Sequence, residues 1–135
     1  MKIIPINQIY INGEFVSSHG TEIFDLINPS TNKKIGEVTL GDEADTKTAI
    51  AAAKETFKTF SKTTKEERIV YLEKLYEAVK KRENELVAVM VKEYGGTLQF
   101  CKMSLQFTLS AFTTNIETLK HFDFEKIVGQ SNVEK

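Results

Sequence analysis

The pattern of apolar and polar positions changes once along the chain, near residue 42. Before this point, β-branched and aromatic residues alternate with polar ones and are interrupted by turn residues, which is typical of short strands. After it, apolar residues recur three and four positions apart among helix-forming residues. The pattern predicts an α+β chain in which strands come first and helices second. We expect strands and turns in 1–41, about four helices in 42–122, and an arm or strand in 123–135.

The amino-terminal part contains four short segments with strand character. These segments are 9–11, 14–16, 23–27 and 34–40. Asn12-Gly13 separates the first two and predicts a tight hairpin, because both residues tolerate the positive φ angles of a type I′ turn. Asn28-Pro29 ends the third, since proline lacks a backbone donor. Gly36 marks an expected irregularity in the fourth.

Capping residues predict where the helices begin and end. Asp42 is suited to the N-cap of the first helix, with Asp45 adding negative charge to its first turn. Thr64 and Glu67 have the spacing of a capping box at the start of the second. The third covers about 83–94 and ends at Gly95, since glycine adopts the left-handed conformation that follows many helices.

The fourth predicted helix, about 98–120, is unusually apolar. Between Thr97 and Leu119 its only charged residues are Lys102 and Glu117. Apolar side chains fall on several of its faces, and those that share one face are Phe100, Met103 and Phe107. Such a helix requires burial on most sides. The two preceding helices can cover part of it, and the chain holds too little further structure to cover the rest.

Composition and charge narrow the class of protein. With 135 residues, 18 basic and 19 acidic side chains and a net charge of −1, the chain has the composition of an ordinary globular domain. It has no basic block, which argues against nucleic acid and anionic membrane surfaces as partners. No apolar stretch reaches the length of a membrane span, and Pro5 interrupts the first apolar run. We therefore expect a cytoplasmic location.

The single cysteine and the two histidines are the first candidates for chemistry. Cys101 lies within the apolar helix, with no histidine nearer in sequence than His121, so a packing role is expected. A small enzyme that uses Cys101 as its nucleophile is the alternative, and native thiol labelling would distinguish the two. His19 and His121 lack metal-ligand spacing and are expected at the surface.

Two further features near residue 95 have simple interpretations. Gly95-Gly96 follows a predicted helix, so it has the character of a helix end and not of a phosphate-binding loop. Glu93 places a carboxylate in the last turn of that helix, where it opposes the negative end of the helix dipole. Solvent or a bound cation would compensate this charge.

The order of several short motifs is more informative than any one of them. The order closely resembles that of the amino-terminal region of NAD(P)-dependent aldehyde dehydrogenases. The motifs are Ile11-Asn12-Gly13-Glu14-Phe15, Asn28-Pro29-Ser30-Thr31, Asp45 to Phe60 with its Ala-Ile-Ala-Ala-Ala run, Thr64-x-x-Glu67-Arg68, and Glu93-Tyr94-Gly95. The resemblance covers essentially the whole chain and implies a single partial domain, 1–135, within the α/β fold of that family.

The resemblance also implies which residues of the enzyme are absent. In the family, the nucleophilic cysteine, the general-base glutamate and the oxyanion-hole asparagine all lie further along a much longer chain, and Cys101 matches none of them. No catalytic or cofactor-binding residue is therefore expected here. NAD or NADP would serve the full enzyme, with none bound to this chain alone. Gly96-Thr97 stands where the family commonly has Lys-Pro, and Phe60 where tryptophan is frequent, so the subfamily remains open.

Three lesser features follow from the same resemblance. A sodium or potassium ion is expected at the backbone oxygens of Leu26 and Ile27 together with Glu93. Met103 and Phe107 are expected to line the tunnel through which the aldehyde reaches the active site. The segment 124–133 resembles the strand that family members contribute to an oligomerisation sheet, which implies a homo-oligomer.

These observations favour one function and leave a second open. The first is the amino-terminal segment of an enzyme that oxidises an aldehyde to a carboxylic acid. The segment would be inactive alone and would have the remainder of the enzyme, or another copy of itself, as its partner. The second is a freestanding protein-interaction or self-associating module derived from the same family. The aldehyde, the choice between NAD and NADP, and the oligomeric state are not determined.

Overall fold

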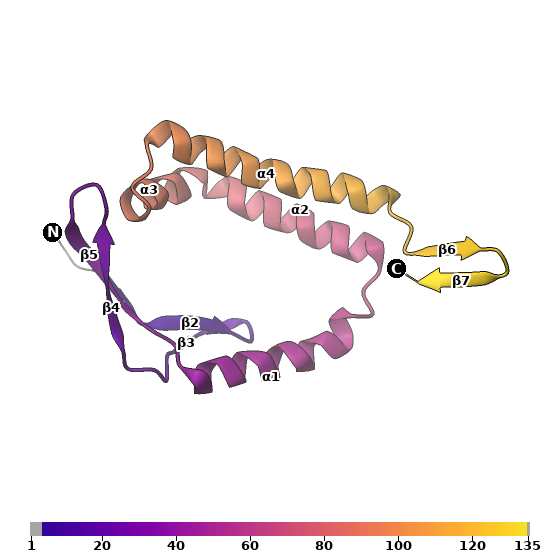
Figure 1. Cartoon of the computed structure of the whole chain (residues 1–135), viewed down its shortest axis with the longest axis horizontal. Helices are drawn as coiled ribbons and strands as arrows, with labels where there is room; N and C mark the ends of the chain where they lie inside the picture. The colour runs from indigo at the N-terminus through magenta and orange to yellow at the C-terminus, as the bar shows by residue number, and fades with distance from the viewer. Residues whose placement is uncertain (1–3, 135) are drawn as a thin grey trace.

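The computed structural model describes residues 4–134, which form seven strands and four helices. In chain order they are β1 (Ile4–Ile6), β2 (Gln8–Ile11), β3 (Glu14–Ser17), β4 (Ile23–Asn28), β5 (Lys33–Thr39), α1 (Glu43–Phe60), α2 (Lys65–Lys81), α3 (Glu83–Glu93), α4 (Leu98–His121), β6 (Glu125–Val128) and β7 (Ser131–Glu134). The elements follow one another around an open arc, with α2 and α4 side by side across from α1 (Figure 1). The predicted α+β class is confirmed.

The strands form three separate small sheets. In the three-stranded sheet, β5 lies in the centre, parallel to β1 and antiparallel to β4. The pairing with β4 skips Ile35, so the predicted irregularity lies beside Gly36. Gly36 is required for another reason: an added Cβ would lie 2.9 Å from the Ile4 carbonyl oxygen. Strand β1 was not predicted, because its partner lies about thirty residues away and local sequence gives no sign of it.

The predicted hairpin is confirmed by the pairing of β2 with β3. Ile11 pairs with Glu14, which leaves Asn12 and Gly13 as the two-residue turn. Their φ angles of 54° and 86° are both positive, as a type I′ turn requires. The sequence signal was sufficient here because the turn chemistry and the strand register are both local.

The predicted helix caps are also confirmed. Asp42 with Asp45, and Thr64 with Glu67, each form a reciprocal capping box in which both side chains accept from backbone N–H groups. Gly95, with a φ of 75°, follows the end of α3. None of the helices in the described part of the chain combines the length and apolar character needed to cross a membrane.

The buried core is small and is centred on α4. This helix packs against α2 and α3, and it supplies Cys101, Leu105, Leu109 and Ile116 to the core. Val87 of α3 packs against this row of buried α4 residues, which we call the seam of α4. These four α4 residues share one face of the helix, as their spacing of four and seven positions requires.

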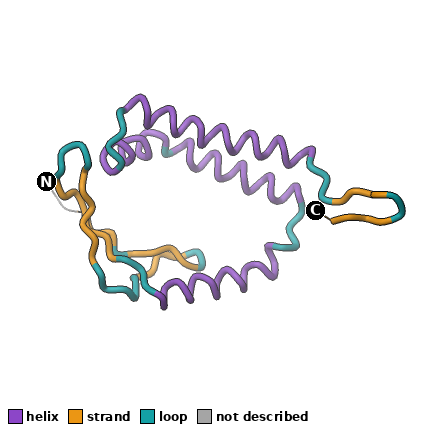
Figure 2. Tube along the Cα trace, viewed as in Figure 1, coloured by secondary structure: helices purple, strands orange, loops and turns teal. Residues whose placement is uncertain are grey.

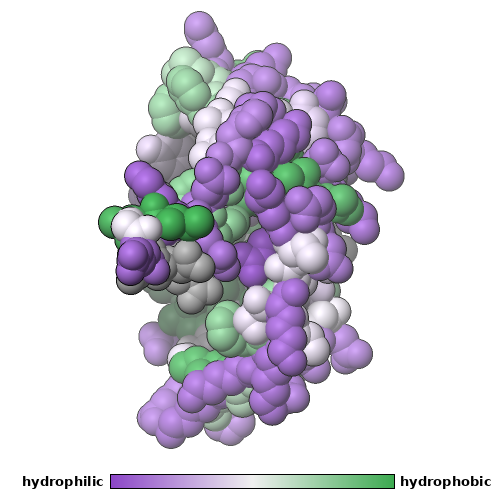
Figure 3. All heavy atoms as spheres, turned by 90° about the vertical axis from the view of Figure 1, so that its right-hand side faces the viewer, coloured by the Kyte–Doolittle hydropathy of each residue, from purple (hydrophilic) through white to green (hydrophobic). Residues whose placement is uncertain are grey.

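The opposite face of α4 lies open. Phe100, Met103 and Phe107 are 41%, 49% and 68% exposed. The accessible surface of the chain is 10613 Å². A closed monomer of 15.3 kDa would expose about 7,100 Å², so this chain exposes roughly 3,500 Å² more than its mass requires. On the side of the molecule that corresponds to the right of Figure 1, hydrophobic residues are exposed among hydrophilic ones (Figure 3).

The tail forms a hairpin where the sequence predicted a strand or an arm. Strands β6 and β7 pair with each other and with no other strand of the described residues. The hairpin projects from the end of α4 (Figure 2), and Ile127 is 74% exposed. A lone two-stranded hairpin is marginally stable in water. Each of its strands has an edge with no strand partner among the described residues, and a further strand can pair there. The division of 1–135 into one partial domain stays a prediction.

The seam of α4 allows a test of which of its side chains contribute to the free energy of unfolding. Leu105→Ala should destabilise the chain by about 2–5 kcal/mol, because a buried leucine leaves a cavity when truncated. Phe107→Ala, on the same helix, should change the free energy of unfolding by no more than about 0.5 kcal/mol, because Phe107 is exposed. Urea denaturation followed by circular dichroism measures both, and equal losses would contradict this assignment of faces.

Candidate functional site

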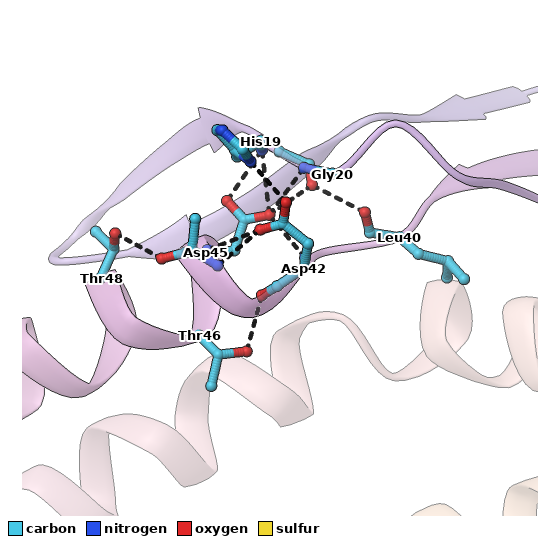
Figure 4. A network of polar contacts seen from close by, with 9 residues as sticks. His19, Gly20, Leu40, Asp42, Asp45, Thr46 and Thr48 are labelled. Carbon is cyan, nitrogen blue, oxygen red and sulfur yellow. Dashed lines mark hydrogen bonds and ion pairs between the residues drawn. The ribbon is translucent and has the colours of Figure 1, made fainter.

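The densest polar network in the described residues lies at the amino end of α1. There the loop after β3 folds back onto the helix (Figure 4), and contacts join Ser18, His19 and Gly20 to Asp42 and Asp45. The Asp45 carboxylate accepts from the backbone N–H groups of His19 at 3.0 Å, Gly20 at 3.2 Å and Asp42 at 3.0 Å. The Ser18 hydroxyl lies 2.9 Å from the same carboxylate. The His19 ring Nδ1 lies 2.6 Å from Asp42 Oδ2.

These contacts shift the ionisation of all three titratable groups. Hydrogen bonds from the backbone N–H groups of His19 and Asp42 hold the pKa of Asp45 well below its usual value of 3.8. The hydrogen bond from the His19 ring lowers the pKa of Asp42. The same hydrogen bond and the Asp42 charge raise the pKa of His19. The network is therefore most strongly held when both aspartates are ionised.

The network contains serine, histidine and aspartate, yet its geometry is not that of a hydrolase triad. A triad requires the serine hydroxyl to contact the histidine ring. Here the Ser18 hydroxyl instead lies near the Leu40 carbonyl oxygen, at 3.1 Å, and the Asp45 carboxylate. Among the described residues the Ser18 hydroxyl contacts no histidine ring, and the network connects the β3–β4 loop to α1.

Sequence reasoning located the parts of this network without joining them. It placed Asp42 and Asp45 at the helix start and His19 at the surface, and His19 is exposed. The contacts connect residues 23 to 27 positions apart, and no local pattern predicts such a return of the chain. The surface position predicted for His121 is confirmed as well, and its ring contacts Glu117 at 3.1 Å.

Cys101 has the packing role that its sequence context predicted. Its side chain is fully buried beside Val87 and Leu105. The side chains that share this cluster with it are apolar, which fits a packing role. Within residues 4–134 there is also no cluster of three His, Cys, Asp or Glu side chains that could hold a metal ion.

The residues expected to bind a monovalent cation lie on two elements that contact each other. The end of α3 meets the turn after β4, where the Ser30 hydroxyl lies 3.5 Å from the Gly95 carbonyl oxygen. Leu26 and Ile27 flank the irregular pairing in β4, which disrupts the backbone ladder there. Glu93 is exposed. Backbone and carboxylate oxygens suit sodium or potassium, so the donor set fits and the site stays a prediction.

The two residues expected to line the aldehyde tunnel lie on an open face of α4, where further protein would have to complete the tunnel wall. Met103 and Phe107 are both exposed on the face of α4 opposite its buried seam. This arrangement leaves them free for contact with further protein or with an apolar ligand. Their contact with an aldehyde stays a prediction.

The described residues do not fit a nicotinamide dinucleotide. Such a cofactor is bound where a glycine-rich turn leads from a strand into a helix, with its phosphates at the helix amino end. In residues 4–134 the only direct passage from strand to helix is from β5 to α1. The amino end of α1 already holds the carboxylates of Asp42 and Asp45, which would repel a phosphate.

Comparison with known proteins places the chain in a family. The model of the aldehyde dehydrogenase family matches residues 15–135. A Staphylococcus aureus (strain USA300) protein, whose name assigns it provisionally to the aldehyde dehydrogenases, is 32% identical over 127 residues, covering 93% of this chain and 27% of that protein. Its matched region thus includes nearly all the elements described above.

Solved structures share the fold. An aldehyde dehydrogenase from Bartonella henselae superimposes with a TM-score of 0.90 at 25% identity, over 96% of this chain and 28% of that one. Aldehyde dehydrogenase C from Pseudomonas syringae, solved as a mutant with NAD⁺ and octanal, has a TM-score of 0.90 at 23% identity, over 96% and 27%. The same fold therefore forms about a quarter of each of these two aldehyde dehydrogenase structures.

The chain belongs to the aldehyde dehydrogenase family. It spans about a quarter of the length of the relatives that it matches, 27% of the Staphylococcus aureus protein. The expected family and the expected partial coverage of its fold are therefore confirmed.

The polar network gives a prediction about acid stability. A carboxyl group whose pKa is lowered by folding contributes stability above its unfolded pKa, and this contribution is lost as the pH falls through the folded pKa. Asp45→Asn should therefore lower the melting temperature at neutral pH and leave it nearly unchanged in strong acid. Thermal unfolding across the acid range measures the difference.

The matched control is Glu55→Gln on the same helix. Within residues 4–134 the one ion pair of Glu55 is an exposed pair with Lys58, so its loss should leave the acid dependence intact. If both variants shift the acid limb equally, the network does not hold the loop onto α1.

Proposed function

We propose that these residues are the amino-terminal segment of an NAD(P)-dependent aldehyde dehydrogenase, and that their role in it is structural. In the whole enzyme an aldehyde would be oxidised to a carboxylic acid. The observation that carries this proposal is the open apolar surface of a chain in the aldehyde dehydrogenase family. The segment would supply surfaces against which the rest of the enzyme packs.

The size of the open surface supports this role over that of a small binding module. One partner in a standard protein–protein interface buries about 800 Å². The excess surface of this chain, roughly 3,500 Å², is several times larger. A partner that covers such an area has to surround the segment on several sides, as the rest of one folded domain does.

The distribution of the open surface supports the same conclusion. One part is the face of α4 that carries Phe100, Met103 and Phe107. Another is an apolar groove of about 370 Å³ between the β2–β3 hairpin and α1, lined by three alanines of α1 and by Tyr10, Phe57 and Phe60. Both surfaces fit aliphatic and aromatic side chains, and they lie on separate elements of the arc (Figure 1).

Catalysis would belong to residues outside this segment. Thiol attack on an aldehyde needs an accessible thiolate with a base near it, and Cys101 is fully buried. The described residues do not fit the dinucleotide either, for the reasons given above. We infer that the segment alone neither binds NAD(P) nor oxidises aldehydes. Met103 and Phe107 would contribute one wall of the path to the active site.

Assembly would use the carboxy-terminal hairpin. Strands β6 and β7 have no strand partner beyond each other among the described residues, and Ile127 and Val128 are exposed. Pairing with a strand from elsewhere in the enzyme or from another copy would satisfy the open edge. A freestanding module that associates with itself through this hairpin and α4 is the second candidate. The cytoplasmic location expected from the sequence stays a prediction.

A chimeric enzyme tests the proposal. The chain should replace the matched 127 residues of the Staphylococcus aureus relative and give a folded protein with NAD(P)-dependent aldehyde oxidation, provided that the relative is itself active. The 135-residue chain assayed alone should give none. Phe107→Asp in the chimera should abolish assembly, since a carboxylate would then lie in an apolar interface.

The matched control for this experiment is Lys102→Asp, which changes the charge of an exposed residue of the same helix that lies outside this face. It should leave the chimera active. A chimera that folds without activity, or Phe107→Asp with no effect, would contradict the structural role. A chain that forms a stable, defined homo-oligomer by itself would favour the freestanding module.

The expected cation site is tested separately. If Leu26, Ile27 and Glu93 hold sodium or potassium, the melting temperature of the chimera should rise with either ion and not with tetramethylammonium at equal ionic strength. Glu93→Gln should remove the difference, because the carboxylate supplies the charge. An unchanged response in Glu93→Gln would exclude Glu93 as a ligand.

A further inference from the structure

We propose that Asn12, at the tip of the β2–β3 hairpin, is a site of spontaneous deamidation that loosens this hairpin from α1. The reaction is attack of a backbone nitrogen on the preceding asparagine side chain. It requires a free backbone N–H, an unbonded side-chain amide and room for a five-membered ring. Among the described residues the first two requirements are met together at Asn12 and Gly13, and both residues are exposed to solvent.

The nitrogen of Gly13 makes no hydrogen bond to another described residue. Ile11–Glu14 is the last residue pair of the hairpin before the turn, so Gly13 lies within the turn. Its N–H donates to no carbonyl among the described residues. Nothing lies within 4 Å of the position that a Gly13 Cβ would occupy. The nucleophile therefore has no competing hydrogen bond among the described residues, and the side of Gly13 on which a Cβ would stand is open.

The side chain of Asn12 is equally available. Asn12 is exposed, and its amide makes no hydrogen bond to any described residue. By contrast, Asn28 holds the backbone N–H groups of Ser30 and Thr31 with its side-chain oxygen. Proline follows Asn28 and has no N–H to attack with.

The chemistry balances with water as the only co-reactant. The Gly13 nitrogen forms a bond to the side-chain carbonyl carbon of Asn12, its proton passes to solvent, and the amide nitrogen leaves as ammonia. Water then opens the cyclic imide at one of its two carbonyls. The products are aspartate, or isoaspartate with the side-chain methylene in the main chain.

Either product alters the contact between the hairpin and α1. Asn12, Ala49 and Ala53 are among the residues that line the apolar groove of about 370 Å³, and β2 contacts α1. Isoaspartate lengthens a turn whose type I′ geometry needs two residues, so the Ile11–Glu14 register is lost. Both products add a negative charge next to Glu14. The modification would open the groove against which other parts of the enzyme are proposed to pack.

Peptide mapping by mass spectrometry tests the proposal on the full 135-residue chain aged under native, mildly alkaline conditions. Conversion at Asn12 should be at least several-fold faster than at Asn32. Asn32 is the matched control, because it is exposed and has a similar φ of 51°, but Lys33 follows it. Isoaspartyl methyltransferase labelling distinguishes isoaspartate from aspartate.

A second comparison separates the folded turn from the sequence alone. The same ageing in concentrated urea reports the reactivity of the unfolded Asn-Gly pair. If Asn12 converts in urea and stays intact in the native chain, the turn protects it and the proposal is overturned. Asn12→Gly should keep the turn and prevent the loss of stability that the aged wild-type chain shows. An equal loss in this variant would exclude Asn12 as its cause.

Discussion

Helix α4 has to be buried on two sides, and this constraint governs the rest of the structure. One side carries the seam of Cys101, Leu105, Leu109 and Ile116, which α2 and α3 cover. The other carries Phe100, Met103 and Phe107, which no described residue buries. A helix that is apolar on most of its circumference loses much of its stabilisation when one face remains in water. The segment thus has enough core to define its shape and too little to close its surface.

Polar contacts hold the remainder of the arc where apolar packing is sparse. The Asp45 carboxylate connects the β3–β4 loop to α1 through the backbone N–H groups of His19 and Gly20, and the hairpin lies against the same helix. These contacts fix the apolar groove between the hairpin and α1 before anything fills it. Such preorganisation reduces the entropy that a covering partner has to lose on docking. It is consistent with a segment whose role is to present surfaces and not to perform chemistry.

The sequence predicted those features whose causes are local. The Asn12-Gly13 turn, both capping boxes and the helix end before Gly95 depend on residues within four positions of one another. Cys101 was expected to be buried because its surroundings are apolar. Strand β1 and the meeting of His19 with Asp42 depend on contacts 23 or more positions apart, which no periodicity encodes. The tunnel and cation residues were proposed from the family resemblance. The structure gives their positions, and their roles stay predictions.

The most direct measurement is hydroxyl-radical footprinting of Met103 and Phe107 in the isolated chain and in the full-length chimera. Oxidation reports the solvent exposure of each side chain, so it tests whether other parts of the enzyme cover this face of α4. We predict extensive oxidation of both residues in the isolated chain and strong protection in the chimera, with Leu105 protected in both. Equal oxidation of Met103 and Phe107 in the two proteins would contradict the account.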